Sequence, residues 1–487
     1  RMDRLWFPAR SCKRDDTAGV WPCTDWPEDG VAQPPKPAST SYAKTADPIV
    51  NRLEPSLVLV NFDMPYSVSG ITERNYYGTG VIVDAERGLV VVDRNTVPVV
   101  IGDVRLTFAG TIEIPGRVEY VHPLHNLAIV SYDPKLIGTT PAKAAVFKPG
   151  DVTPGEQIWA VGMRGDGKVQ SRAANIASVD PVVFPLSRTF QFRESNMETV
   201  QLVNGPGDYD GVLANKQGEV IATWASFAYE AGREITQENR GIPADLIVEM
   251  LSVVRGGGTL RSLEAELFPV PLASARKLGL PDRWIQRLEQ HSPERRQALS
   301  VTRLVGGSPA ASLLQSGDLI LDIDGVVVNR FREVERAVQK PQVRVTVLRD
   351  GVEQVITVPT VELGGRDLDR VVLWAGAVLQ QPHRSLSAQR GIPPEGVFVG
   401  YFSYGSPATR YQLWAGRRII EVDGQPTPDL DSFIKAVAGR PDHSSVRLRT
   451  MAWNGAVDVI TLKLDTRYWP AYELKRTSSG WDRTMLE

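Results

Sequence analysis

Cysteine is scarce in this sequence: among 487 residues only Cys12 and Cys23 are cysteines, and both lie near the N-terminus. They could close a short disulfide loop, but the rest of the chain has no cysteine, so the protein is not built as a disulfide scaffold. We interpret the two residues as unpaired thiols in a linker, with a disulfide between them as the alternative.

Long apolar runs are also missing. No stretch approaches the ~18 apolar residues that a membrane-spanning helix needs, and runs such as 57–60 (LVLV) and 88–93 (GLVVVD) have the length of strands. We therefore expect no membrane span. The sequence starts at Arg1 without a charged and then apolar leader, so no secretory signal is visible and the compartment is left open.

A net charge of one sign is absent as well. Lysine and arginine number 55, aspartate and glutamate 57, and the formal charge is −2. This balance creates no whole-chain field that would attract nucleic acid or an anionic membrane, and no nucleic-acid-binding module is recognisable. With 42% hydrophobic and 23% charged residues, the composition indicates a soluble globular protein without a nucleic-acid partner.

What is present is a long series of short strand-like segments. Residues 24–48 are rich in Pro, Ala, Ser and Thr, and we interpret them as a linker or disordered spacer. From about Glu54 to Leu251, β-branched runs alternate with Gly, Pro, Asn and Asp, which predicts an all-β barrel or sandwich. At this length the chain should hold about three domains.

Two similar units follow a glycine-rich hinge (RGGG, 255–258) and cover about 262–362 and 366–465. Each contains Gly-Ser-Pro-Ala, then a strand ending in Asp-Gly, then a helix-like segment. The first unit has GSPA at 307–310 with GDLILDIDG and FREVERAV, and the second has GSPA at 405–408 with AGRRIIEVDG and DLDSFIKAV. The shared order and spacing indicate an internal repeat.

A second repeat links the two ends of the chain. Residues 2–14 align without gaps to 464–476, and each copy is soon followed by Gly and Trp. Because the later copy directly follows the second unit, we interpret 1–23 as the tail of a preceding unit of the same kind, and the chain as the second half of a duplicated protein. We expect the aromatic tail 466–487 to pack back on the second unit, with a disordered end as the alternative.

Both repeat units resemble PDZ domains of the bacterial type. In that fold a ligand C-terminus or extended segment adds as a strand beside an edge of the sheet. The resemblance places this edge on ALSVTRLV (298–305) and GVFVGYF (396–402), and a unit used only for packing is the alternative. The predicted peptide-binding residues are Ala298, Leu299, Ser300 and Val301 in the first unit and Gly396, Val397, Phe398 and Val399 in the second.

The β-rich segment before the repeats resembles the HtrA/Deg serine proteases. The motifs that carry the resemblance are GTGVIVD (78–84), EQIWAVGM (156–163), NRGIPADLI (239–247) and PGDYDGVL (206–213), the last of which parallels a PGNSGGPL nucleophile loop. The match extends to the long subclass of plants and fungi, which has two protease-like halves, each followed by PDZ domains. The resemblance implies a mainly β fold, with a trypsin-like double β-barrel at 49–254 followed by two PDZ-like α+β domains.

The same resemblance locates the positions of a catalytic histidine, aspartate and serine, which hold Asn95, Asn126 and Tyr209 here. An amide cannot accept a proton near neutral pH, so it cannot act as a general base. A phenol with a pKa near 10 stays mostly protonated, and its rigid ring keeps the oxygen away from the place of a serine hydroxyl. Asp208 and Asp210 would repel the charge that an oxyanion hole stabilises. We therefore predict no catalytic residue.

No cofactor and no metal site is predicted. Only His122 and His125 are close in sequence, and on an extended segment their spacing would point them to opposite sides. No cysteine or carboxylate pattern nearby completes a ligand set, so we interpret both histidines as surface or packing residues. No serine lies in a GxSxG context, and no phosphate-binding loop occurs.

These features favour a catalytically inactive protease half that binds peptides or unfolded protein segments through its PDZ-like units and regulates or assembles the parent protease. The resemblance implies an upstream half with a working triad as a partner, a homo-oligomer, and a location in the periplasm, an organelle or the nucleus. Two alternatives stay open: an active serine endopeptidase that uses an unrecognised residue, and an oligomerisation scaffold with closed PDZ grooves.

Overall fold

The computed structural model describes residues 35–68, 74–186, 192–232 and 234–486. The chain divides into two compact units, residues 1–37 and 38–487, and the helices and strands named below belong to the second. The tail fragment predicted at 1–23, with Cys12 and Cys23, lies outside the described residues. Ala38 is fixed within the predicted spacer, because its N–H donates to the Leu136 carbonyl.

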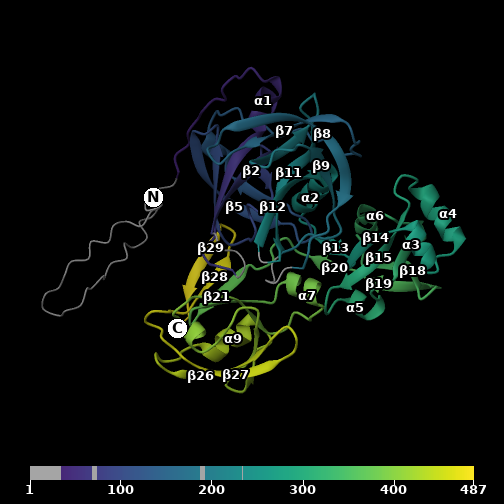
Figure 1. The fold of residues 1–487 in the computed structure, drawn as a ribbon. Coiled ribbons are helices and arrows are strands. Elements are labelled where there is room, and N and C mark those ends of the chain that lie inside the picture. Colours follow the sequence, from purple (N-terminus) through teal and green to yellow (C-terminus); the bar gives the residue numbers. More distant parts are fainter. Residues whose placement is uncertain (1–34, 69–73, 187–191, 233, 487) are drawn as a thin grey trace. The chain divides into compact units, whose positions relative to one another are not determined.

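The first barrel closes from six strands in the order β1-β2-β3-β6-β5-β4 (Figure 1). Its elements are α1 (Pro48–Leu53), η1 (Glu54–Ser56), β1 (Leu57–Asp63), β2 (Asn75–Asp84), β3 (Leu89–Val92), β4 (Asp103–Phe108), β5 (Ile112–Val121), β6 (Ala128–Tyr132) and η2 (Pro134–Ile137). Along β1, Val58, Val60 and Phe62 fill the interior of this barrel, while Leu57 and Leu59 between them belong to another core. This period of two is that of a strand with two buried faces.

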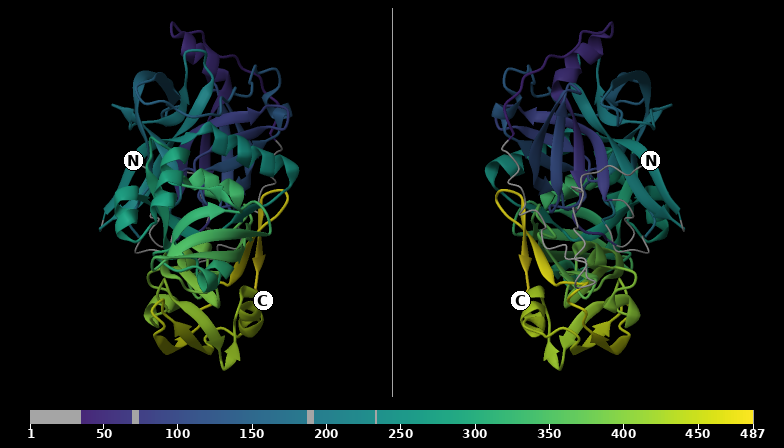
Figure 2. Two further views of the ribbon diagram at one scale, coloured as in Figure 1. Left: turned by 90° about the vertical axis from the view of Figure 1, so that its right-hand side faces the viewer. Right: turned by 90° about the vertical axis from the view of Figure 1, so that its left-hand side faces the viewer.

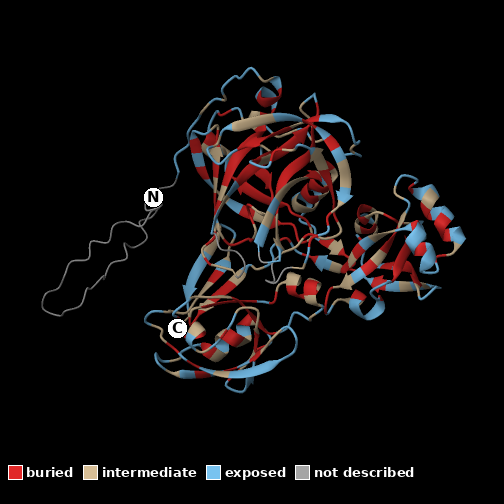
Figure 3. Cartoon of the chain, viewed as in Figure 1, coloured by how far each residue is buried: buried red, intermediate tan, exposed pale blue. Residues whose placement is uncertain are grey.

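The second barrel closes in the order β10-β11-β12-β9-β8-β7. Its elements are β7 (Gln157–Met163), β8 (Val169–Pro181), β9 (Glu198–Val203), β10 (Asp210–Ala214), β11 (Val220–Ala231), β12 (Glu234–Pro243) and the following helix α2 (Ala244–Gly256). Leu57 and Leu59 of the first barrel share one apolar core with Val161 and Val212 of the second. Figure 3 shows the buried residues concentrated in these strands. The predicted trypsin-like double barrel is confirmed.

The first PDZ-like unit is an α+β segment whose sheet has the order β14-β15-β16-β18-β19, with β17 beside β16. Its elements are β13 (Leu260–Ser262), β14 (Ala265–Pro271), α3 (Leu272–Lys277), α4 (Asp282–His291), β15 (Gln297–Leu304), α5 (Pro309–Leu313), β16 (Leu319–Ile323), β17 (Val326–Val327), α6 (Phe331–Ala337), β18 (Gln342–Arg349), β19 (Val352–Pro359) and β20 (Val361–Leu363).

The second PDZ-like unit repeats this plan. Its elements are β21 (Arg370–Trp374), β22 (Ala377–Gln380), α7 (Arg384–Arg390), β23 (Val397–Phe402), α8 (Pro407–Arg410), β24 (Arg418–Val422), β25 (Gln425–Pro426), α9 (Leu430–Val437), β26 (Ser445–Met451), β27 (Val457–Lys463), β28 (Tyr472–Arg476) and β29 (Trp481–Met485). The repeated GSPA motif starts a helix in both units: Ser308 and Ser406 cap α5 and α8, and proline takes the first helical position.

The sequence placed the ligand-accepting edge on the wrong strands. β15 pairs with β14 and β16, and β23 pairs with β22 and β24. A strand flanked on both sides has no free edge, so an added strand cannot pair there. This removes the predicted peptide-binding residues Ala298, Leu299, Ser300 and Val301 of β15, and Gly396, Val397, Phe398 and Val399 at β23. The strands that lie next to β15 and β23 on the side away from β16 and β24 are β14 and β22.

The aromatic tail forms a hairpin on the second PDZ-like unit, as the sequence predicted. β28 pairs with β21, from Arg370 opposite Lys475 to Leu373 opposite Tyr472, and β29 pairs with β28. The hairpin also reaches the first barrel, because the Trp481 indole N–H donates to an Asp103 carboxylate oxygen at 3.0 Å. Figure 2 shows the hairpin in yellow beside this barrel. No helix in the described ranges is long and apolar enough to span a membrane.

Candidate functional site

The structure brings two of the three predicted triad positions together at the junction of the barrels. Asn95 lies after β3 and Asn126 before β6, and both amide groups reach Ser226 on β11. Asn95 Nδ2 donates to Ser226 Oγ at 2.9 Å, and Asn126 Nδ2 donates to the Ser226 carbonyl at 2.7 Å. Asn126 Oδ1 in turn accepts the backbone N–H of Arg94 at 2.7 Å. The two amides therefore tie one barrel to the other.

Ser226 is the hydroxyl at the centre of this arrangement, and it is 6% exposed. Its Oγ accepts a second amide N–H, from Gln237 at 2.6 Å, while its backbone N–H donates to Asp93 Oδ2 at 2.8 Å. A serine nucleophile needs a partner that takes its proton. The side chains that contact this Oγ, Asn95 and Gln237, both donate an amide N–H to it. Ser226 Oγ therefore acts as a hydrogen-bond acceptor, and neither contact can take its proton.

Tyr209 stands before β10 and turns its ring into the second barrel. Its hydroxyl donates to the Ala160 carbonyl at 3.1 Å, and the residue is 8% exposed. Burial, reinforced by the nearby Asp208 charge, raises the pKa of the phenol to about 12. A protonated phenol that is already bonded to a main-chain carbonyl presents no attacking oxygen to a ligand.

The two aspartates beside Tyr209 have different surroundings. Asp208 forms an exposed ion pair with Arg164. Asp210 accepts the Thr79 N–H at 2.9 Å, and burial together with the charge of nearby Asp93 raises its pKa to about 7. The contact between the barrels therefore holds a pair of acids, Asp93 and Asp210, that repel each other when both ionise.

A cavity of about 460 Å³ opens beside Asn95 and Asn126, and its wall includes Arg303 of the first PDZ-like unit and His383 of the second. Arg94 lines it as well. The Arg94 guanidinium lies 3.6 Å from the centre of the Phe192 ring and donates to two backbone carbonyls. Burial lowers the Arg94 pKa to about 10. A ligand in this cavity would contact the barrels and both PDZ-like units.

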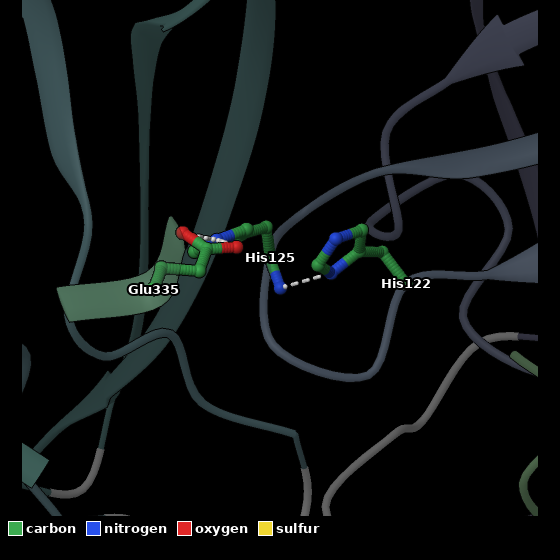
Figure 4. Close-up of side chains that lie close together, drawn as sticks. All are labelled: His122, His125 and Glu335. Atoms are coloured by element: carbon green, nitrogen blue, oxygen red, sulfur yellow. Dashed lines mark hydrogen bonds and ion pairs between the residues drawn. The ribbon is translucent and has the colours of Figure 1, made fainter. Parts of the chain in front are cut away.

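His122 and His125 lie on the same side, which corrects the prediction that they point apart. Their rings stack with centres 4.7 Å apart (Figure 4). The reason is a tight loop: the His122 N–H donates to the Leu127 carbonyl, so the chain between the two histidines is bent and not extended. His122 Nδ1 accepts the backbone N–H groups of Leu124 and His125, and burial holds the His122 pKa well below its usual value.

Glu335 of α6 completes a three-residue cluster that the sequence did not reveal. His125 Nε2 lies 3.0 Å from a Glu335 oxygen, and the ligand atoms of the three residues are within 4.8 Å of one another. Because His122 Nδ1 accepts two N–H groups, its proton sits on Nε2, which favours a hydrogen-bonded contact over metal ligation. Burial would raise the Glu335 pKa, but His125 and Arg332 outweigh it and hold the pKa below its usual value.

The outer edge of β14 is held by one side chain of the second barrel. Asn196 Nδ2 donates to the Ala265 carbonyl, and Asn196 Oδ1 accepts the Leu267 N–H, both at 2.7 Å. An added peptide strand would offer one acceptor and one donor to these same two groups. Asn196 therefore imitates the main chain of a ligand. No sequence pattern indicates this contact.

Comparison with known proteins identifies the relatives of this fold. The family model described as a PDZ-like domain matches residues 368–443. Protease Do-like 7 of Arabidopsis thaliana is 34% identical over 92% of this chain, and the match covers 45% of that protein. The pro-apoptotic serine protease nma111 of Neosartorya fischeri is 30% identical over 99% of this chain and 48% of its own length. Over nearly its whole length the chain is therefore similar to HtrA/Deg-like proteases.

The match to HtrA/Deg-like relatives is partial in length. The chain spans about half the length of the curated relatives it matches, among them the PDZ domain-containing protein C23G3.12c of Schizosaccharomyces pombe, at 31% identity over 99% of this chain and 49% of the relative. A solved HtrA-type protease, AlgW with a tripeptide, aligns with a TM-score of 0.47 at 19% identity, covering 65% of this chain and 96% of that one.

Proposed function

We propose that this chain is the catalytically inactive half of an HtrA/Deg-like protease, and that it captures peptides or unfolded protein segments and thereby regulates or assembles the parent enzyme. The observation that carries the proposal is the engagement of all three triad positions in structural hydrogen bonds: Asn95 and Asn126 bond to Ser226, and Tyr209 bonds to Ala160. Peptide hydrolysis by this chemistry needs a base and a nucleophile within hydrogen-bond reach.

Capture of a peptide is supported by the edge of β14. Two main-chain groups there, the Ala265 carbonyl and the Leu267 N–H, already bind an amide that belongs to another part of the chain. Helix α6 shares the core of this unit with β14, and it contacts α2 through Arg332 and the first barrel through Glu335. A strand entering between β14 and α6 would replace Asn196 with its own main chain.

The activity test uses the full chain with unfolded casein and, separately, with a fluorophosphonate probe of reactive serines. We expect neither cleavage nor labelling. Ser226→Ala is the variant that isolates the one serine hydrogen-bonded to Asn95, and it should behave as the unsubstituted chain does. Time-dependent cleavage or labelling that Ser226→Ala abolishes would establish the endopeptidase alternative, which the names of the relatives favour.

A scaffold without peptide capture is the second candidate, favoured by the fact that both β14 and β22 already have partners on their outer edges. A library of extended and C-terminal peptides, titrated against the full chain and against Asn196→Ala, separates the two functions. Binding that strengthens in the variant supports capture. No binding to either protein, together with an oligomer in light scattering, supports the scaffold.

A further inference from the structure

The groove of the second PDZ-like unit contains a strand of its own chain. β22 uses one edge to pair with β23 and the other to pair with β21, so the edge that would accept a ligand is taken. The pairs on the ligand side are Val372 with Leu379, Leu373 with Val378 and Trp374 with Ala377. They run antiparallel, the direction in which a peptide adds to a PDZ strand.

The identity of this edge follows from the internal repeat. The GSPA motifs at 307–310 and 405–408 put Leu304 and Phe402 at equivalent positions. Leu304 pairs with Ala265 of β14, and Phe402 pairs with Ala377 of β22. β14 and β22 are therefore the same strand of the two units. The edge that Asn196 holds in the first unit is the edge that β21 covers in the second.

The side chains of β21 fill the space between β22 and helix α9. Trp374 packs on Phe433 of α9 edge to face, with ring centres 5.4 Å apart. Val372 and Trp374 are 0% and 2% exposed and belong to the core of this unit. At the start of the strand, Arg370 forms an ion pair with Asp431 of α9 at 2.7 Å. β21 thus contacts both walls of the groove.

A two-residue turn returns β21 onto β22. Ala375 and Gly376 both have positive φ, 52° and 80°, as a type I′ hairpin turn requires. In the first unit the corresponding strand, β13, pairs with β20, and no pairing with β14 occurs among the described residues. The difference between the units is therefore local: a tight turn places the preceding strand in the groove of the second unit.

We propose that the β22–α9 groove is a peptide-binding site whose resident ligand is the strand 370–374. The groove takes an extended apolar peptide with valine and tryptophan at alternate positions, and it is closed to other peptides while β21 is in place. This proposal rests on the proposed function and limits peptide capture to the first PDZ-like unit. Capture at β14 does not depend on what fills the β22–α9 groove, so each of the two proposals can fail without the other.

The test makes the groove accessible and supplies the strand from outside. Trp374→Ala removes the ring on Phe433 in the full chain, and the probe is a capped synthetic peptide with the sequence of residues 369–374 (DRVVLW). We expect it to bind the variant at least about ten-fold more tightly than the unsubstituted chain and to raise the melting temperature of the variant only. Trp453→Ala, at a 52% exposed tryptophan of the same unit, is the matched control without gain in binding.

Three outcomes would overturn the proposal. The first is equal binding to the unsubstituted chain, which would mean an open groove. The second is a folded Trp374→Ala variant that the peptide neither binds nor stabilises. Where the variant does not fold, hydrogen exchange of the unsubstituted chain decides: the proposal requires 370–374 to be protected like 377–380, and rapid exchange confined to 370–374 would refute it. Failure of peptides to bind at β14 bears on the proposed function alone.

Discussion

The two PDZ-like units satisfy the same strand edge in different ways. In the first unit a single asparagine of the second barrel bonds to the edge of β14, and in the second a strand of the unit itself pairs with β22. Two hydrogen bonds from one side chain can be exchanged for those of a peptide at small cost. A paired strand with two buried side chains cannot leave without exposing apolar surface. The edge of β14 is therefore covered reversibly, by Asn196, and the edge of β22 is covered permanently, by β21.

Removal of the tail is expected to have the largest effect on this contrast. Deleting residues 466–487 takes away β28 and β29 and uncovers the apolar contacts of Leu474, Tyr472 and Trp481. Full burial of a leucine such as Leu474 contributes about 1.5 to 3 kcal/mol, and the two partly buried rings add to it, so the chain should lose about 3 kcal/mol or more of its free energy of unfolding. Calorimetry measures this as a lower melting temperature.

Tyr468→Ala, at a residue that is 72% exposed, is the control for the tail and should leave that melting temperature unchanged. A deletion that melts like the intact chain would show that β28 adds nothing to β21. The permanence assigned to the second unit would then rest on the hairpin turn and on the buried side chains of Val372 and Trp374.

Acid should weaken both units, because burial lowers the pKa of His383 in the second to about 4, but only the first through a contact with α6. His122 is neutral in the folded chain and accepts two backbone N–H groups, so its pKa is lowered. A lowered histidine pKa contributes stability that is complete above the unfolded value near 6.5 and is lost as pH falls below it. The loss grows as the pH falls from 6.5 towards 5, and below the ordinary glutamate pKa the Glu335 contact adds to it, because the Glu335 pKa is lowered too.

Hydrogen exchange of α6 and α9 between pH 7 and pH 5 measures this acid effect. We expect faster exchange in α6, which contacts His125 through Glu335, with α9 unchanged. His122→Asn keeps an acceptor for the N–H groups without titrating in this range, so it should flatten the response. An equal response of both helices would contradict the contrast between the units.

Substitution of Asn196 should have the smallest effect on stability and the clearest effect on binding. Asn196→Ala leaves the Ala265 carbonyl and the Leu267 N–H without their partner, at a cost of about 1 to 2 kcal/mol in the docking of the first unit. Peptide affinity at β14 should rise about five- to thirty-fold by the same free energy. Fluorescence anisotropy with a labelled peptide measures it.

Asn204→Ala is the matched control for Asn196, because both asparagines have φ near 54° and Asn204 is exposed. The control should lose a similar amount through backbone strain and gain nothing in affinity. A gain in both variants would mean that general loosening, and not release of the β14 edge, admits the peptide.

The barrels and the repeat could be predicted because both are local patterns. Strand-length apolar runs predicted a β-barrel or sandwich, the resemblance to HtrA/Deg proteases implied the double barrel, and the GSPA motifs mark capped helices in both units. The edge strand could not be predicted in the same way. β14 contains Pro269 and Pro271, which do not read as a strand although proline is tolerated at a sheet edge, and β22 has four residues.

The residue types of the candidate site could be predicted from the sequence, but their hydrogen-bond partners could not. The identities of Asn95, Asn126 and Tyr209 follow from the sequence. Their hydrogen bonds to Ser226 and Ala160 are fixed by barrel packing between residues that are 131, 100 and 49 positions apart. His122 and His125 were misplaced because the turn between them is held by side-chain bonds to the backbone, which spacing alone does not encode.

The order of synthesis gives the pairing of β21 with β28 a further meaning. β21 leaves the ribosome roughly a hundred residues before β28, which supplies its second neighbour. Until β28 is made, the turn at Ala375 and Gly376 holds β21 against β22. Val371 and Leu373 then lack their pairing partners on β28, Leu474 and Tyr472. During that interval β21 could pair with a strand of another copy of the chain. By keeping β21 on β22, the hairpin turn would limit this mispairing during synthesis.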